Sequence, residues 1–236
     1  MANTFLQAEW RKLAMVNYAV DPNLLASYLP AKTEIDLWND TCYISLVGFM
    51  FKNTRVKGFK IPFHINFEEV NLRFYVRYKD NDTWKRGVVF IKEIVPRAAL
   101  TFVANTVYGE NYQTMPMVHS WVERDEELTI EYKWKKKNWH SLKIKADSNP
   151  VPIMPGSEAE FITEHYWGYT KISNTQTAEY EVKHPKWEIY PIHDYWIDVD
   201  FAMVYGSEFN FLKNEIPRSV FLAEGSAISV MQGRKI

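Results

Sequence analysis

Short segments in which apolar and polar residues alternate recur along most of this chain. In segment 71–78, NLRFYVRY, apolar side chains hold every second position and mostly polar side chains hold the positions between them. A strand directs successive side chains to opposite faces, so this period of two predicts an extended strand. The same pattern or continuous apolar character predicts strands at 41–49, 71–78, 87–95, 128–134, 178–182, 187–192, 197–204, 219–222 and 227–231. Turn residues separate these segments, which favours an antiparallel barrel or sandwich with a few helices.

Helix signals are fewer and lie in three places. An Asp-Pro pair at 21–22 has the residue types of an N-cap and a first helical position, and Pro30 ends that segment. Apolar residues spaced three and four apart predict a second helix at 97–107. Ser157 and Glu160 have the spacing of a capping box, which predicts a short helix that begins directly after Ser157.

The length of 236 residues allows one large domain or two small ones. The best candidate linker is segment 148–157, SNPVPIMPGS, which holds three prolines and a glycine. A boundary there would leave a small second unit, so we predict one continuous domain over residues 1–236.

Charge and cysteine content exclude several classes of partner. The 28 basic and 29 acidic residues give a formal net charge of −1, so we expect no nucleic-acid partner and no membrane partner. Cys42 is the single cysteine and lies in an apolar segment, where we interpret it as a small buried side chain in a reduced protein. The first residues have no apolar signal region, and we expect a cytoplasmic location.

Glycine and histidine spacing exclude the common nucleotide, nucleophile and metal motifs. The two nearest glycines, Gly225 and Gly233, are eight positions apart, which rules out GxGxxG, the Walker loop and GxSxG. The six histidines form no HExxH and have no CxxC partner, so only a metal site assembled from distant strands is left open. We therefore expect no metal and no cofactor.

Two features within the strands carry possible chemistry. The polar face of segment 69–77 either lines a small-molecule cavity inside a barrel or lies on the exposed side of a two-sided sheet, and the pattern alone favours exposure. Lys92 lies among apolar neighbours, where a lowered pKa would suit a Schiff base. The alternative, which we favour, is a lysine on the outer face that extends to water.

Several long segments resemble one bacterial family. The segments LAMVNYAVDPNLLASYLPAKTEIDLW, YISLVGFMF, IPFHINFEEVNLRFYVR and RGVVFIKEIVPR, and later YGENY, GSEAEFITEHYWGYT and PRSVFLAEGS, resemble the YqjF-like family of unknown function. That family is grouped with the acetoacetate-decarboxylase-like superfamily. The resemblance implies an α+β, mainly antiparallel β fold, in which a cone-shaped closed barrel with a few short helices surrounds a small, largely apolar cavity.

The resemblance to the decarboxylases themselves stops at their reactive residues. A decarboxylase of this type has two adjacent lysines, one of which forms the Schiff base. The corresponding stretch here is TVYGENYQTM, which has no lysine, and the decarboxylases' arginine before the first helix falls near Ala19. Glu69 is the one residue with a plausible counterpart, so the resemblance does not imply Schiff-base decarboxylation.

The barrel implied by the resemblance makes cavity residues of several polar side chains. Glu69 would act as a general base or orient a water, and Arg73 would hold a carboxylate with two hydrogen bonds. The loop at the superfamily's reactive position supplies a second group, in which Glu110 is a catalytic candidate and the others bind ligand. The full set of candidates is Glu69 and Glu110 for catalysis, and Arg73, Tyr108, Asn111, Tyr112, His64 and His165 for ligand binding.

These residues support one preferred hypothesis and two alternatives. The preferred one is a protein that binds a small organic acid in an aromatic-lined cavity, as a monomer or a homo-oligomer. The first alternative is a lyase or hydratase that acts on a keto or enol acid without a covalent lysine adduct. The second is a structural or interaction protein, which would need an aromatic patch on its exterior.

Overall fold

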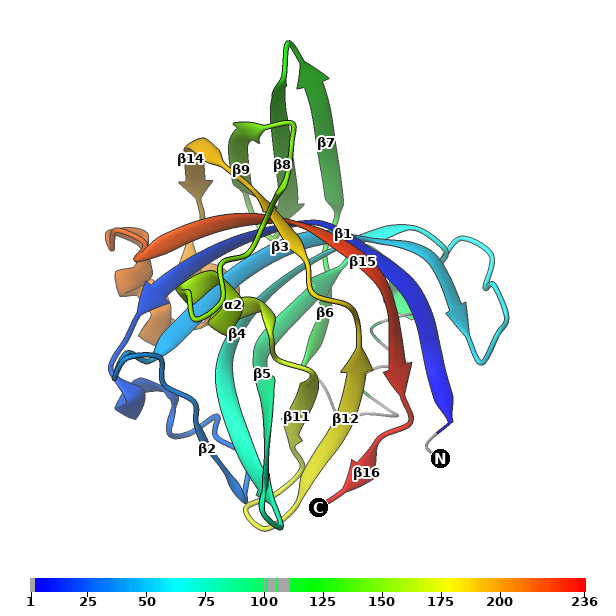
Figure 1. Ribbon diagram of the computed structural model, residues 1–236, viewed down its shortest axis with the longest axis vertical. Helices are drawn as coiled ribbons and strands as arrows, with labels where there is room; N and C mark the ends of the chain where they lie inside the picture. Colours follow the sequence, from blue (N-terminus) through cyan, green and yellow to red (C-terminus); the bar gives the residue numbers. More distant parts are fainter. Residues whose placement is uncertain (1–2, 100, 102–104, 106–110) are drawn as a thin grey trace.

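A computed structural model describes residues 3–99, 101, 105 and 111–236 (Figure 1). Its strands are β1 Thr4–Ala19, β2 Thr33–Ile35, β3 Tyr43–Val56, β4 Phe67–Asp80, β5 Thr83–Val95, β6 Tyr112–Thr114, β7 Met117–Arg124, β8 Glu127–Lys135, β9 Trp139–Asp147, β10 Val151–Pro152, β11 Trp167–Lys171, β12 Thr177–Lys183, β13 Glu188–Tyr190, β14 Ile192–Asp198, β15 Ser219–Met231 and β16 Arg234–Lys235. Its helices are η1 Pro22–Leu25, α2 Glu158–Thr163, α3 Phe201–Tyr205 and η2 Ser207–Lys213.

The larger of two sheets joins the two ends of the chain. Its strands follow the order β10-β13-β15-β1-β3-β4-β5-β11-β12-β16, and β1 pairs antiparallel with both β15 and β3. β5 and β11 pair in parallel at Gly87 and Trp167, whereas β12 also pairs with β15 through Val182 and Val230. The sheet therefore curls so that β15 and β12 meet, with the N- and C-termini close together (Figure 1).

Both faces of the central strands are buried, which explains their apolar sequences. On β4, Leu72 and Phe74 point into a core that lies between the larger sheet and the smaller one. Phe67 and Tyr75 point to the opposite face, into a second core within the curled sheet. A strand buried on two faces sends alternate residues into different environments, and here the second face contains the site described below.

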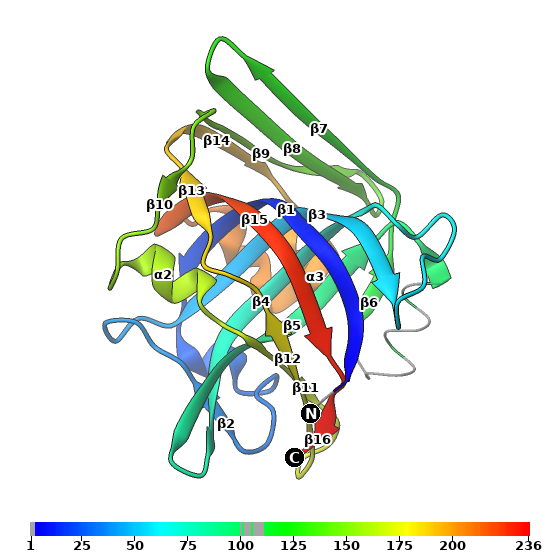
Figure 2. The same cartoon turned by 45° about the vertical axis from the view of Figure 1, so that its right-hand side comes forward.

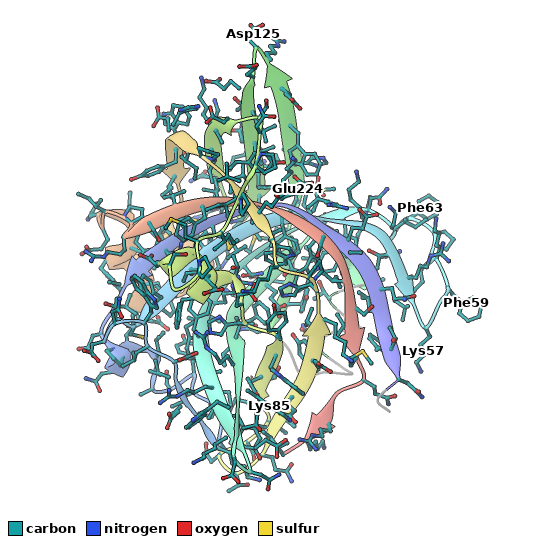
Figure 3. All side chains as sticks on the ribbon, in the orientation of Figure 1. Lys57, Phe59, Phe63, Lys85, Asp125 and Glu224 are labelled. Carbon is teal, nitrogen blue, oxygen red and sulfur yellow. The ribbon has the colours of Figure 1, made fainter. Side chains whose placement is uncertain are left out.

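The smaller sheet, ordered β14-β9-β8-β7, packs across the outer face of the larger one (Figure 2). Tyr132 of β8 lies against Gly48 of β3, where a Cβ would come within 2.9 Å of the tyrosine ring, and its hydroxyl donates a 2.7 Å hydrogen bond to the Lys12 carbonyl oxygen. Glu224 of β15 accepts from the Lys12 ammonium at 2.6 Å beneath this sheet (Figure 3). The Tyr132 contacts anchor the smaller sheet to β1 and β3, and the ion pair joins β1 to β15 within the larger sheet.

Most of the predicted elements are confirmed, with three corrections. The helix expected between Asp21 and Pro30 is the short 3-10 helix η1, which ends at Leu25. Segment 201–204 was predicted as strand and is helix α3, because Asp200 caps it by accepting a hydrogen bond from the Met203 amide. Segments 219–222 and 227–231 belong to one strand, β15. The short helix after Ser157 is confirmed as α2, and the helix expected at 97–107 lies largely outside the described residues.

Three strands of eight or more residues were not predicted: β7, β9 and the longest, β1. Its register with β3 shifts between Arg11 and Ala14, and Lys12 has a φ of 54°. This irregularity breaks the period of two in the middle of the strand. Within the described residues, no helix is long and apolar enough to cross a bilayer.

Candidate functional site

A cavity of about 170 Å³ lies on the inner face of the larger sheet. Aromatic rings form much of its wall: Trp10 packs edge-on against Phe49 at 5.4 Å and against Trp187 at 6.3 Å, and Phe51 stacks on Phe67 at 4.7 Å. Such a cavity has room for a small organic molecule of roughly ten non-hydrogen atoms. Part of the chain's aromatic content therefore lines this cavity.

The polar face of β4 lines this cavity, which excludes the interpretation as a solvent-exposed face. Glu69, Asn71 and Arg73 are 2%, 1% and 8% exposed and lie on one side of the strand. The Asn71 amide donates to Glu69 Oε1 at 2.9 Å, and the Tyr112 hydroxyl donates to Glu69 Oε2 at 3.2 Å. These donors direct the Glu69 carboxylate toward the Tyr112 end of the strand.

Arg73 lies at the other end of this polar row and pairs with no described carboxylate. Its one printed hydrogen bond is weak, from Nη2 to the Met15 sulfur at 3.8 Å, and its Nε is buried with no acceptor among the described residues. The guanidinium carbon lies 5.8 Å from the centre of the Tyr75 ring. A buried, unpaired charge is costly, so this guanidinium is available to an anion in the cavity.

A β-bulge decides which residues of β5 face the cavity. Leu72 pairs with Lys92, but Arg73 pairs with Phe90, so one extra residue of β5 lies between these pairs. Phe90 and Glu93 consequently line the cavity, whereas the Lys92 ammonium donates to the Val204 carbonyl oxygen on the other side. Burial lowers the pKa of Lys92, yet the lysine does not face the cavity. Lys92 lies on the outer face, as the favoured interpretation expects, but it is half-buried and bonded to a backbone carbonyl oxygen.

His165 connects the cavity wall to a buried ion pair. Its Nε2 donates to Asp36 Oδ2 at 3.2 Å, and Arg86 Nε donates to the same oxygen at 2.6 Å. Burial lowers the pKa of His165 to about 4, against a smaller opposing effect of Asp36. Burial alone would raise the pKa of Asp36, but the hydrogen bonds from His165 and Arg86 outweigh it and lower that pKa.

The remaining predicted site residues are distributed differently. Tyr112 lines the cavity, whereas the Asn111 amide donates to the Ile91 carbonyl oxygen at 2.6 Å on the opposite side of β5. His64 lies in the β3–β4 loop, away from the cavity lining, with its Nδ1 2.8 Å from the Pro62 carbonyl oxygen. Tyr108 and Glu110 lie outside the described residues.

Sequence reasoning missed three contributors to the site. Glu93 faces the cavity because of the bulge in β5, and no residue type in the sequence predicts that bulge. Asp36 lies directly after the short strand β2. His184 lines the cavity, with its ring stacked 4.4 Å from that of Trp187. Among the described residues, no group of three or more potential ligands is placed to hold a metal ion.

One known protein family matches most of the chain. The profile of the DUF2071 family, described as an uncharacterized conserved protein, matches residues 7–227. The chain belongs to the DUF2071 family. Another protein similar to this DUF2071 chain, the uncharacterized protein YqjF of Bacillus subtilis strain 168, is 27% identical over 187 residues, or 77% of this chain and 74% of YqjF. The resemblance seen in the sequence is therefore confirmed.

Solved structures similar to this DUF2071 protein share one fold. The acetoacetate decarboxylase of Legionella pneumophila has a TM-score of 0.65 at 12% identity, covering 99% of this chain and 88% of that one. The enduracididine biosynthesis enzyme MppR complexed with pyruvate has a TM-score of 0.69 at 13% identity, covering 100% and 91%. At such identities the likeness establishes the acetoacetate-decarboxylase-like fold and nothing about activity.

Proposed function

We propose that this protein binds a small organic acid in the central cavity, with the acid's carboxylate held by Arg73. The observation that carries the proposal is the buried Arg73 guanidinium, which forms no ion pair with a described residue. A planar guanidinium matches a carboxylate with two parallel hydrogen bonds. A bound carboxylate would supply the missing charge and acceptors at once.

The surroundings of Arg73 favour a small ligand with an apolar portion. Phe90 pairs with Arg73 across the strands, and Val88 and Trp167 line the same cavity. The enduracididine biosynthesis enzyme MppR, which has a similar fold, was solved with pyruvate, a small keto acid, and this is consistent with a ligand of this size. We therefore propose a ligand that combines one carboxylate with a short carbon chain.

The cone-shaped closed barrel is part of this proposal. The pairing of β12 with β15 supports it, because the strand order then returns to its starting point around the cavity. Val182 and Val230, which form that pairing, also line the cavity. A closed wall would exclude water and strengthen the attraction between Arg73 and a bound carboxylate. We propose that the protein acts in this form in the cytoplasm.

Binding of matched carboxylates and amides tests the proposal. Calorimetric titration and thermal shift would compare short carboxylic acids with their uncharged amides, on the unaltered protein and on Arg73→Met. We expect carboxylates to bind and Arg73→Met to weaken them about tenfold or more, as for loss of a charged hydrogen bond. Arg77→Met is the matched control, because Arg77 lies on the same strand but pairs with Glu34 at the exposed end.

Two results would refute carboxylate binding at Arg73. One is equal affinity for the acids and the amides. The other is unchanged carboxylate affinity in Arg73→Met, with the protein shown to be folded by circular dichroism.

A second candidate function is a lyase or hydratase that acts on a keto or enol acid. The supporting observation is Glu69, a buried carboxylate that Asn71 and Tyr112 orient at the cavity surface. Such a group is suited to move a proton to or from a bound acid. Turnover of each ligand found by thermal shift would be followed by NMR. We expect Glu69→Gln to abolish turnover while binding persists, and equal turnover in that variant would exclude Glu69 as the base.

A further inference from the structure

The wall of the cavity contains a histidine, His165, which is held by a carboxylate that does not itself line the cavity. His165 follows α2 and its side chain is 1% exposed, while Asp36 follows β2 and its side chain is 6% exposed. His165 Nε2 lies 3.2 Å from Asp36 Oδ2, the oxygen that also accepts from Arg86 Nε at 2.6 Å. Asp36 does not line the cavity and His165 does. The ring is thus held at its Nε2 edge by a group behind the wall.

This contact determines which ring nitrogen carries the proton. Arg86 supplies a permanent positive charge beside Asp36, and the carboxylate is ionised and can only accept hydrogen bonds. His165 Nε2 must therefore be the donor. Because burial keeps the imidazole neutral at pH 7, its other nitrogen, Nδ1, bears a lone pair.

The lone pair of Nδ1 has no partner within the described protein. The atom is buried and accepts no hydrogen bond from a described residue. The ring cannot turn freely, since Tyr75 packs at 4.7 Å and Phe161 at 5.0 Å from it, between ring centres. The Tyr75 hydroxyl is itself bonded to Ser45 at 2.7 Å. A buried, rigid acceptor without a donor is costly in a folded protein.

This acceptor and the Arg73 guanidinium, which has no carboxylate partner among the described residues, both lie beside Tyr75. Tyr75 separates them: its ring centre is 5.8 Å from the Arg73 guanidinium carbon and 4.7 Å from the centre of the His165 ring. Both residues line the cavity. A small acid held by Arg73 therefore shares the cavity with the His165 side chain.

We propose that the ligand is a hydroxy acid, whose carboxylate is held by Arg73 and whose hydroxyl donates a hydrogen bond to His165 Nδ1. This inference rests on the proposed function and names the class of acid. A hydroxyl supplies the donor that Nδ1 lacks. The corresponding keto acid would place an oxygen lone pair against the nitrogen lone pair, and the unsubstituted acid would leave Nδ1 unsatisfied. Asp36 is a positioning residue in this arrangement.

Matched triads of acids test the inference. Calorimetry at pH 7.5 would use lactate, pyruvate and propionate, and the corresponding 2- and 3-substituted acids of four to six carbons. In at least one triad we expect the hydroxy acid to bind about tenfold or more tightly than its keto and unsubstituted partners. His165→Phe keeps the stacked ring and removes the acceptor. We expect it to abolish this preference while the affinity for the unsubstituted acid changes less than about threefold.

The tautomer of His165 can be measured directly, and this test does not depend on ligand binding by a variant. Nitrogen-15 NMR of histidine-labelled protein should show one neutral imidazole protonated at Nε2 between pH 5.5 and 8, and this signal should be absent from His165→Phe. A hydroxy acid should shift its Nδ1 resonance, whereas propionate should shift it much less.

The outcomes separate the two proposals. If acids bind through Arg73 but every triad shows equal affinities, or if His165 carries its proton on Nδ1, the hydroxy-acid inference is refuted and the proposed function stands. If no carboxylate binds, or if Arg73→Met retains all affinity, the proposed function fails and this inference fails with it.

Discussion

Asn71 of β4 and Glu93 of β5 lie directly opposite each other, on the far side of the bulge from the pair formed by Arg73 and Phe90. This register brings a second buried acid beside the amide that orients Glu69. It also turns Lys92 toward α3. A single extra residue in β5 thus gives the cavity a glutamate in place of a lysine, which bears directly on the chemistry available there.

Trapping with borohydride should label no lysine in this protein. Lys92 donates to the Val204 carbonyl oxygen, and the described cavity lining contains no lysine. A Schiff base needs an amine in contact with the bound keto acid. Incubation with pyruvate or acetoacetate and borohydride, followed by mass spectrometry, should leave the mass unchanged. A stable adduct on Lys92 would contradict the outward orientation described here.

Arg73→Met should stabilise the ligand-free protein. The guanidinium is 8% exposed and has no described carboxylate partner, so methionine removes a buried charge and retains much of the volume. Replacement of a buried charge by a packed apolar side chain is expected to add about 1 kcal/mol or more to the free energy of unfolding. Urea denaturation measures it, with Arg77→Met expected within about 0.5 kcal/mol. A large loss in Arg73→Met would indicate a structural role.

Stability should decrease as the pH falls from 6.5 toward 4, in part because of His165. Its pKa is about 4 in the folded protein and near 6.5 in the unfolded chain, so the unfolded state binds the proton first. The stability linked to neutral His165 is fully present above pH 6.5. By pH 4, protonation of the unfolded chain lowers the free energy of unfolding by about 3 kcal/mol.

His165→Phe isolates this contribution. Denaturation at several pH values should show a shallower loss of stability in the variant than in the unaltered protein. A decrease remains, because burial also lowers the pKa of His140 and His184. Parallel pH profiles for the two proteins would exclude a buried neutral His165.

Gly168→Ala should damage the cavity wall. A Cβ at this position would lie 2.2 Å from Cζ of Tyr180, the residue that pairs with Gly168 across β11 and β12. The clash should cost about 1–3 kcal/mol of unfolding free energy and weaken ligand binding, because both residues line the cavity. Gly156→Ala is the control: it has a φ of 75° but open space around it, so we expect it to leave binding unchanged.

Local sequence patterns predicted the parts of the fold that depend on neighbouring residues. The alternation in segment 71–78 predicted β4, and Ser157 with Glu160 predicted α2. Segment 201–204 was mistaken for strand because four apolar residues suit either structure, and the cap at Asp200 decided for a helix. The family resemblance predicts Arg73, Glu69 and Tyr112 as site residues, and all three line the cavity.

The identity of the cavity residues on β5 and beyond required the tertiary structure. A bulge changes which residues face inward, and the residue types do not reveal where a bulge lies. Glu93 was therefore not among the predicted site residues. Asp36 and His165 are 129 positions apart and meet only because β2 pairs with β4 near the end of α2. No local periodicity reports such a contact.

By itself, the sequence determined that this chain forms mainly strands, lacks the glycine spacing of phosphate-binding loops, and has no lysine pair at the decarboxylase position. The first two conclusions follow from backbone periodicity and residue type, which are local properties, and the third follows from the family resemblance. Only the tertiary structure decided that the polar face of β4 points inward and that Lys92 points out. It also decided that, among the described residues, Arg73 has no carboxylate partner and the Nδ1 of His165 has no donor, beside one cavity. The burial of a polar side chain and its hydrogen-bonding partners depend on segments that are distant in the chain. The free energy of burying that side chain therefore depends on which segments the fold brings together.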